Sequence, residues 1–324
     1  MKSRLALRIF CAEFPPAVKF PPTGVEHSRG SHYNLSVFPR VRYGVPELPE
    51  VETLVRDLRP YLLGRRIASI HVSGQPLRRE WSPEWERRLI GRRVGEIRRR
   101  GKWILVGLDR ELCLGIHLGM TGQLTVVPAR QFVAPHTHVV ITLDRGQKQL
   151  RFRDVRRFGS ATLFPDQERA EEFFRASKLG PEPFDLETSY WRERLAATER
   201  CLKAVLLDQR VVAGIGNIYA DESLFQARLH PCQLGRDTNR QEAERLRRAL
   251  AIVLNRAIKK RGSSIRDYLR ASGKKGEYQR EFRVYGRYRR PCPRCRAPIE
   301  RIRLAGRSTH FCPACQQRSP AARH

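Results

Sequence analysis

The sequence predicts an α+β protein of several domains: an antiparallel β-sandwich or barrel, then a helical region, then a small cysteine-bearing unit. Residues 67–164 hold short strand-like segments separated by Gly, Pro and Asp turns, the pattern of an antiparallel sandwich or barrel. The pattern becomes helical around Pro181-Glu182-Pro183. Four of the eight cysteines lie in two Cys-x2-Cys pairs near the carboxyl end. No internal repeat is visible, and 324 residues are enough for about two domains with cores of their own.

The first helix is predicted to open in the stretch Pro46-Glu47-Leu48-Pro49-Glu50-Val51-Glu52-Thr53. A proline at the first helical position loses no needed hydrogen bond, and the three carboxylates suit the positive end of a helix. One face of this helix is apolar, made of Leu48, Val51, Leu54, Val55 and Leu58.

The remaining elements follow in order along the chain. Strand-like runs lie at 67–72, 94–97, 102–108, 112–117, 123–127, 138–143, 150–152 and 161–164. Helical segments lie at about 187–197, 200–208, 217–227 and 239–261, with Gly214, Gly216 and Pro231 as punctuation.

The composition is strongly basic, with 63 Lys and Arg against 33 Asp and Glu, a net charge of +30 and a sequence pI near 10.9. Such an excess concerns partners rather than fold, and nucleic acid is the first candidate. A ribosomal or otherwise RNA-coating protein would have the same composition. No apolar run approaches the roughly 20 residues that a membrane span requires, so we expect no membrane contact.

The clustered cysteines predict a metal site. Cys292-x2-Cys295 and Cys312-x2-Cys315 are separated by 16 residues, which is zinc-ribbon spacing. Four thiolates complete a closed tetrahedron around one Zn²⁺, and a closed site leaves no open position for chemistry. The zinc is therefore expected to be structural. Two disulfides are the alternative, and clustering of only these four cysteines favours a metal in a reduced compartment.

Several strings in this order resemble the formamidopyrimidine-DNA glycosylase (Fpg/MutM) family of base-excision repair enzymes, over essentially residues 46–317. They are the opening Pro-Glu-Leu-Pro-Glu, Gly101-Lys102-Trp103, His117-Leu118-Gly119-Met120-Thr121-Gly122, Asp154-Val155-Arg156-Arg157-Phe158-Gly159, Val212-Ala213-Gly214-Ile215-Gly216-Asn217-Ile218-Tyr219-Ala220-Asp221-Glu222, and the cysteine unit. The resemblance implies an N-terminal antiparallel β-sandwich with flanking helices (46–178), a helical helix–two-turn–helix (H2TH) domain (179–286) and a C-terminal zinc ribbon (287–318), followed by a tail (319–324).

The resemblance also implies four catalytic residues: Pro46, Glu47, Lys102 and Arg307. Pro46 would be an amino-terminal nucleophile that attacks C1′ of the damaged nucleotide and forms an iminium with the opened sugar. Glu47 would shuttle protons to and from the sugar. Lys102 and Arg307 would assist, and the strand would break by β- and δ-elimination. The expected activity is removal of oxidised purines, namely 8-oxoguanine and formamidopyrimidines, coupled to abasic-site (AP) lyase cleavage.

DNA contacts carried over from the family number seven: Met120, His136, Arg156, Phe158, Asn217, Arg200 and Lys203. Met120, Arg156 and Phe158 would fill the stack that the extruded nucleotide leaves, because extrusion costs a few kcal/mol that must be offset. Asn217 would begin a helix whose free N–H groups clamp phosphate. Glu199 stands where the family usually has a lysine, which puts that phosphate contact in doubt.

Residues 1–45 have no sustained periodicity. A DNA-touching basic tail and a transit peptide are two interpretations. The third, which we favour, is that translation begins at a GTG codon read as Val45, so that loss of the initiator methionine exposes Pro46. The stretch Ser272–Gln279 reads as a mobile loop that covers the everted base, or as a plain linker.

Three alternatives to the leading hypothesis stay open. One is an endonuclease VIII (Nei)-like enzyme that prefers oxidised pyrimidines. Another is a non-catalytic protein that binds lesions or abasic DNA, which follows if residues 1–45 are retained. The third is a zinc-ribbon transcription factor. The expected partner is double-stranded damaged DNA, and the expected setting is a monomer in the bacterial cytoplasm or nucleoid.

Overall fold

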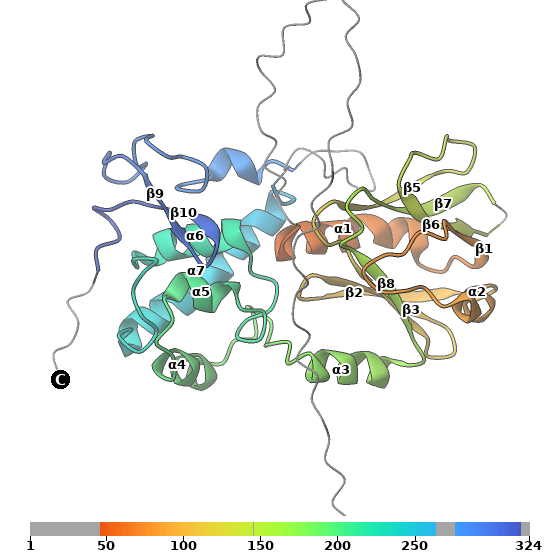
Figure 1. The fold of residues 1–324 in the computed structure, drawn as a ribbon, viewed down its shortest axis with the longest axis horizontal. Helices are drawn as coiled ribbons and strands as arrows, with labels where there is room; N and C mark the ends of the chain where they lie inside the picture. The colour runs from red at the N-terminus through yellow and green to blue at the C-terminus, as the bar shows by residue number, and fades with distance from the viewer. Residues whose placement is uncertain (1–45, 145, 264–275, 319–324) are drawn as a thin grey trace, which may run out of the picture. The chain divides into compact units, whose positions relative to one another are not determined.

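In a computed structural model of the chain, residues 46–144, 146–263 and 276–318 are described (Figure 1). They form a β-sandwich with three flanking helices, a group of four helices, and a two-stranded ribbon. The predicted fold class is therefore confirmed. The strand pattern left a sandwich and a barrel open, and the structure has a sandwich.

Two four-stranded antiparallel sheets make the sandwich. One has the order β1-β6-β7-β5, with bounds Ile67–Val72, Thr137–Leu143, Lys148–Asp154 and Gly122–Pro128. The other has the order β2-β3-β4-β8, with bounds Val94–Arg100, Trp103–Leu108, Cys113–His117 and Ser160–Phe164. Alternate residues of both sheets point into one shared apolar core, and all eight strands lie where the strand-like runs predicted them.

Helix α1 (Leu48–Leu62) closes this core with its apolar face. Helices α2 (Pro83–Leu89) and α3 (Gln167–Ala176) were not predicted. Both begin with a cap residue: Ser82 stands before Pro83, and the Asp166 side chain accepts the backbone N–H of Arg169 at 2.7 Å. Helix α3 lies beside the β2-β3-β4-β8 sheet (Figure 1). Its Phe173 and Phe174 pack on the outer face of that sheet, against Leu105 and Phe164.

Four helices follow at the predicted places: α4 (Thr188–Ala196), α5 (Leu202–Leu207), α6 (Asn217–Ala227) and α7 (Arg240–Lys259). A short 3₁₀ turn, η1, spans Tyr278–Glu281. Helix α6 is buried on nearly every side, which explains its lack of a polar face. The rest of the helical region packs around α6.

Strands β9 (Glu300–Leu304) and β10 (Arg307–Phe311) form a hairpin joined by Ala305 and Gly306. Both turn residues have positive φ, 46° and 70°, as the tight turns that match strand twist require. The ribbon packs on α6 through Phe225, Val284 and Ile299. Among the described helices, none is long and apolar enough to cross a membrane.

A candidate active site at the amino end of helix α6

The carboxylate of Glu47 lies at the amino end of helix α6, 169 residues further along the chain. Its oxygens accept the backbone N–H groups of Gly216 and Ile218 at 2.9 Å each, and that of Tyr219 at 3.3 Å. These groups carry the positive end of the α6 dipole, so the helix stabilises a negative charge there. The backbone of Leu48 donates to the carbonyl of Gly214 at 3.0 Å and holds the two segments together.

Glu47 is nevertheless poised between its charged and neutral forms. Burial raises its pKa from 4.5 to about 7, against the lowering effect of the Lys102 ammonium. A carboxyl with a pKa near neutrality can both give and take a proton at physiological pH, which is what an acid–base catalyst requires. The neighbouring Glu50 raises the same pKa further, by repulsion.

Glu50 ties three elements together behind Glu47. Its Oε1 accepts the Tyr219 hydroxyl at 2.6 Å and both the backbone N–H and the hydroxyl of Ser263, at 2.8 and 2.9 Å. Its Oε2 accepts the Glu47 backbone N–H at 3.1 Å. This buried network joins the start of α1 to α6 and to the chain just after α7. Tyr219 lies inside the Gly-Asn-Ile-Tyr string and could have been found there, whereas nothing in the sequence around Ser263 marks it.

Lys102 and Arg307 come from two different domains toward the same place. The Lys102 ammonium donates to the Ile215 carbonyl at 2.9 Å, in the turn before α6. Burial lowers its pKa, Glu47 and Glu50 oppose that effect, and the charge of Arg307 adds to it. Arg307 is exposed at the first position of β10. The structure thus brings Glu47, Lys102 and Arg307 within electrostatic reach of one another.

Pro46 is buried directly before Glu47, at the start of the described residues. Because the two residues are adjacent in the chain, a nucleophile at Pro46 has the Glu47 carboxyl beside it.

The role expected of the α6 amino terminus needs a correction. Its backbone N–H groups at Gly216, Ile218 and Tyr219 point at Glu47, so they are not free for a phosphate. The Asn217 side chain donates through Nδ2 to the Ser308 carbonyl at 3.0 Å, which links α6 to the ribbon strand next to Arg307.

The three residues expected to enter the duplex lie on two loops that pack against each other. The Arg156 guanidinium stacks 4.5 Å above the ring of Phe158, which is 43% exposed. Met120 is half-buried on the other loop. A Cβ at Gly119 would lie 2.5 Å from the backbone N of Gly159, so the two loop backbones are in direct contact. His136 is exposed at the start of β6, with φ of 65°.

The structure contradicts the predicted DNA contact of Lys203. Its side chain is 0% exposed, and its ammonium donates to the Asp221 carboxylate at 2.5 Å and to the Asn217 carbonyl at 2.9 Å. A fully buried, ion-paired ammonium cannot meet a phosphate. Arg200, by contrast, is exposed and pairs with Asp208 at 2.8 Å. Glu199 is exposed and pairs with Arg236.

His117 is a further group beside the site that the sequence reading did not single out. Burial lowers its pKa to about 4, and the charges of Lys102, Arg78 and Arg79 add to the effect. Its Nδ1 accepts the Gly119 N–H at 3.1 Å, so a neutral ring carries its proton on Nε2. His117 is thus a neutral hydrogen-bond donor at physiological pH, next to the Met120 loop.

The four clustered cysteines hold one structural Zn²⁺. All four Sγ atoms lie within 4.8 Å of one another, with pairs at 3.4 and 3.9 Å. Zinc–sulfur bonds of about 2.3 Å in a tetrahedron require sulfur separations of this size. Backbone N–H groups of Arg294 and Cys315 point at sulfurs of Cys292 and Cys312, both at 3.4 Å, as metal-binding knuckles do. The predicted cofactor is confirmed.

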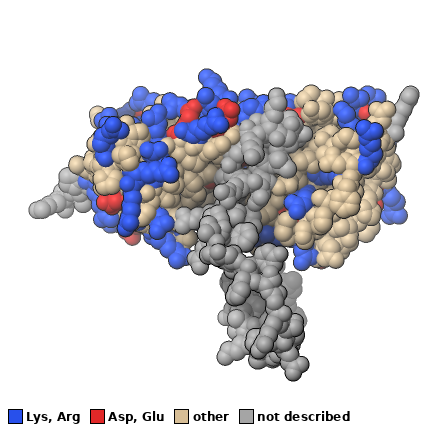
Figure 2. Space-filling view, turned by 90° about the horizontal axis from the view of Figure 1, so that it is seen from above, with Lys and Arg blue, Asp and Glu red and all other residues tan. Residues whose placement is uncertain are grey.

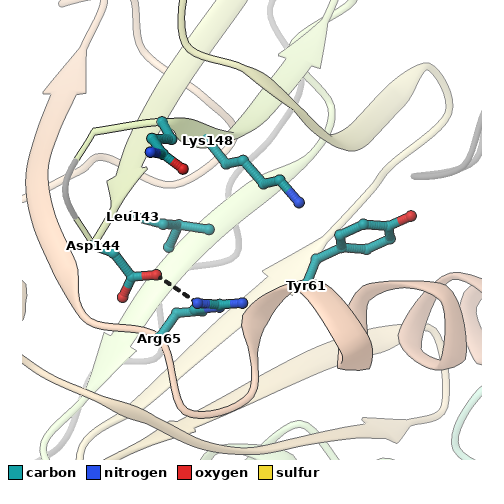
Figure 3. A pocket seen from close by; sticks show the side chains of 6 residues that line it. Tyr61, Arg65, Leu143, Asp144 and Lys148 are labelled. Atoms are coloured by element: carbon teal, nitrogen blue, oxygen red, sulfur yellow. Dashed lines mark hydrogen bonds and ion pairs between the residues drawn. The ribbon is translucent and has the colours of Figure 1, made fainter.

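A second hollow, of about 450 Å³, lies at the other end of α1 (Figure 3). Figure 3 shows Lys148 and Tyr61 on one side and the Arg65–Asp144 ion pair, at 3.1 Å, on the other. Tyr61 is separated from Glu47 by almost the whole of α1, roughly 20 Å at 1.5 Å per residue. This hollow is therefore not part of the site around Glu47.

On the face of the molecule shown in Figure 2, Lys and Arg side chains clearly outnumber Asp and Glu. A basic surface, the Glu47 carboxyl with Lys102 beside a buried proline, an exposed Arg156–Phe158 stack and a zinc ribbon together define a class: an enzyme that acts on nucleic acid.

Comparison with known proteins identifies the family within that class. Residues 45–161 match the formamidopyrimidine-DNA glycosylase N-terminal domain, 179–268 the H2TH domain of the same enzymes, and 290–318 the zinc finger found in FPG and IleRS. A formamidopyrimidine-DNA glycosylase of Desulforamulus reducens is 42% identical over 277 residues, which is 84% of this chain and 99% of that protein. The chain therefore belongs to the formamidopyrimidine-DNA glycosylase family and is a DNA glycosylase of base-excision repair.

Two solved structures agree with this assignment. A Lactococcus lactis FPG variant in complex with Fapy-dG-containing DNA has a TM-score of 0.79 and 35% identity, over 84% of this chain and 100% of that one. The wild-type Lactococcus lactis Fpg (MutM) with DNA that contains an oxidised pyrimidine has a TM-score of 0.78, with the same identity and coverage. DNA is accordingly the partner of this chain.

Proposed function

We propose that this protein removes oxidised purines from double-stranded DNA and then cleaves the strand, with the amine of Pro46 as its nucleophile. The observation that carries the proposal is the buried Glu47 carboxyl, adjacent to Pro46 and with a pKa of about 7.

The chemistry follows from these two residues. The Pro46 nitrogen attacks C1′, the bond from C1′ to the base breaks, and the base leaves with the electron pair and a proton. Opening of the sugar at O4′ takes a second proton and yields an iminium between Pro46 and C1′. The iminium acidifies the C2′ proton, whose loss expels the 3′-phosphate; a second elimination expels the 5′-phosphate and leaves a one-nucleotide gap.

Glu47 supplies and accepts these protons. Its neutral form protonates O4′, and its carboxylate form takes the C2′ proton. Lys102 and Arg307 stabilise the negative charge of the phosphates beside the reacting sugar, because both are cations directed at this point. His136, Asn217 and Arg200 are the proposed DNA contacts, and Met120, Arg156 and Phe158 are the proposed wedge.

The nucleophile requires a free amine, since an amide nitrogen has no electron pair to give. We therefore propose that the working protein begins at Pro46, and that residues 1–45 are absent from it. A monomer in the bacterial cytoplasm completes the proposal.

Excision assays test this function directly. Duplexes with 8-oxoguanine or formamidopyrimidine opposite cytosine should be cut by the chain that begins at Pro46. Glu47→Gln should reduce the single-turnover rate by about 10²–10⁴, the usual contribution of a general acid–base group. The exposed Glu96→Gln of β2 is the matched control and should act at the normal rate. Equal rates for both variants would refute the role of Glu47.

A wider lesion range is the second candidate function, because a similar protein has been solved with oxidised-pyrimidine DNA. Thymine glycol duplexes in the same assay distinguish the two. Faster cleavage of thymine glycol than of 8-oxoguanine would favour the Nei-like alternative.

A further inference from the structure

Asp154, the last residue of β7, is a buried carboxylate outside the chemistry described above. It is 0% exposed. Its Oδ1 accepts the Thr121 hydroxyl at 2.5 Å and the backbone N–H of Arg156 at 3.2 Å, and its Oδ2 accepts the backbone N–H of Gly159 at 2.7 Å. The donors are a hydroxyl and two backbone groups, so this charge is held by neutral partners.

These donors come from the two loops that carry the proposed wedge. Thr121 follows Met120 directly, and the Thr121 hydroxyl also accepts the Arg156 N–H at 3.1 Å. Arg156 and Gly159 flank Phe158 in the other loop. A single carboxylate therefore fixes both loops relative to each other, at the point where their backbones touch.

The backbone of Asp154 also holds a third segment, residues 136–138, by hydrogen bonds. Its N–H donates to the His136 carbonyl at 2.9 Å, and its carbonyl lies 2.9 Å from Nε2 of His138. The other ring nitrogen of His138 lies 3.1 Å from the Ser73 hydroxyl. The exposed His136 is thus set by the same residue as Met120 and Phe158.

We infer that Asp154 is a positioning residue for base extrusion: it holds the Met120 and Arg156–Phe158 loops in the one arrangement that fills the vacated stack. This inference rests on the proposed function, since it takes these three side chains as the wedge. Asp154 makes its hydrogen bonds to these segments and acts through the residues that it holds.

Extrusion and cleavage can be separated by choice of substrate. A duplex with 8-oxoguanine requires a base to be extruded, whereas a duplex with an abasic site has no base to remove. Asp154→Ala removes three hydrogen bonds to buried or half-buried donors and should slow single-turnover excision of 8-oxoguanine about tenfold or more. Cleavage of the abasic duplex should stay within about twofold of the original rate.

Two conservative variants keep the test informative if the alanine variant folds poorly. Asp154→Asn keeps one acceptor oxygen and should restore most of the excision rate. Thr121→Val removes the shared hydroxyl at nearly constant volume and should slow excision without affecting abasic cleavage. Asp144→Ala, an exposed aspartate that pairs with Arg65 beside the remote hollow, is the control and should change neither rate.

Fluorescence of 2-aminopurine placed next to the lesion reports the extrusion step itself. A slower rise of this signal in Asp154→Ala and Thr121→Val, with abasic cleavage retained, supports the inference. An unchanged signal, or an equal loss of both activities in the variants that fold, would overturn it. If the unsubstituted protein fails to cleave abasic DNA, the proposed function is wrong instead.

Discussion

Glu47 is a buried carboxyl whose surroundings leave it able to give and take a proton near neutral pH. Burial favours its neutral form, whereas the Lys102 ammonium and the N–H groups at the start of α6 favour its charged form. Together these effects leave its pKa at about 7. The protein thereby keeps a proton donor next to Pro46 without exposing it to water.

This balance predicts a pH dependence of stability. The pKa of Glu47 in the folded protein, about 7, is above its ordinary value of 4.5, so the folded state binds the proton more tightly. The resulting stabilisation is complete below pH 4.5 and is lost as the pH rises to about 7. Between pH 5 and pH 8 the protein should lose on the order of 2 kcal/mol of unfolding free energy relative to Glu47→Gln. Urea unfolding at both pH values measures the difference, and a pH-independent difference would contradict it.

Substitutions of Lys203 and Arg200 are predicted to have opposite effects on stability and on the salt dependence of DNA binding. Lys203→Ala leaves the Asp221 carboxylate buried and unpaired, which should cost about 3–5 kcal/mol of unfolding free energy. The slope of log Kobs for DNA against log salt should not change. Arg200→Ala should cost no more than about 1 kcal/mol, because its ion pair is exposed, yet reduce the salt slope by about 1. Denaturant unfolding and fluorescence anisotropy measure both, and a reduced salt slope for Lys203→Ala would contradict its burial.

Lys203 and Arg200 also show which features of the site could not be predicted from the sequence. Cysteine spacing located the metal site because four ligands within two knuckles admit few other arrangements. The motifs around Met120 and Phe158 pointed to two loops that the structure brings into contact, and the roles of these residues stay predictions. The burial of Lys203 could not be predicted, because it depends on Asp221, a residue 18 positions away in the chain that only the fold brings against the ammonium. Free N–H groups at α6 were equally misjudged, since Glu47 reaches them only in the folded protein.

At the scale of elements, helix α6 connects the Glu47 site to the zinc ribbon. Its amino end binds Glu47, and Asp221 in its second turn accepts the backbone N–H of His310 in β10 at 2.9 Å. The next residue, Glu222, accepts three successive backbone N–H groups from residues 283–285 at 2.9–3.1 Å. One helix thus positions both the Glu47 carboxyl, the proposed acid–base group, and the ribbon that carries Arg307.

The close fit at the start of α6 predicts the effect of a single methyl group. A Cβ at Gly216 would lie 2.3 Å from Cδ of Glu47, a distance that no side chain tolerates. Gly216→Ala should therefore displace the carboxyl and reduce excision by about 10² or more. Gly95→Ala is the matched control, because the nearest atom to its added carbon is 4.0 Å away. An active Gly216→Ala variant would show that Glu47 need not occupy this place.

Element prediction succeeded for segments that are buried in a core and bounded by turn residues. The eight strands and helices α1 and α7 carry apolar patterns, and α6, which is buried on nearly every side, is preceded by Gly214 and Gly216 and followed by Pro231. Helices α2 and α3 were missed because they are short and lie on the surface of the sandwich, and each is marked mainly by its cap residue. Capping signals that consist of one residue are easily passed over.

At the scale of the whole molecule, the zinc ribbon carries Arg307, a proposed catalytic group, but has little core of its own. Structural zinc supplies about 10–16 kcal/mol in comparable peptides, so the ribbon should unfold when the metal is removed. Arg307 then leaves the site, and both DNA affinity and excision should fall by at least tenfold. Elemental analysis should give one zinc per chain before chelation. Full activity after complete loss of zinc would contradict this dependence.

The amine of Pro46 is the central claim, and borohydride trapping tests it most directly. Reduction of the iminium during reaction with abasic DNA joins protein and DNA covalently, and peptide mapping locates the bond. The account predicts that the chain beginning at Pro46 is trapped at residue 46, and that the full 324-residue chain, with its leader verified by intact mass, is not. Trapping of the full chain at an equal rate, or attachment at another residue, would contradict it.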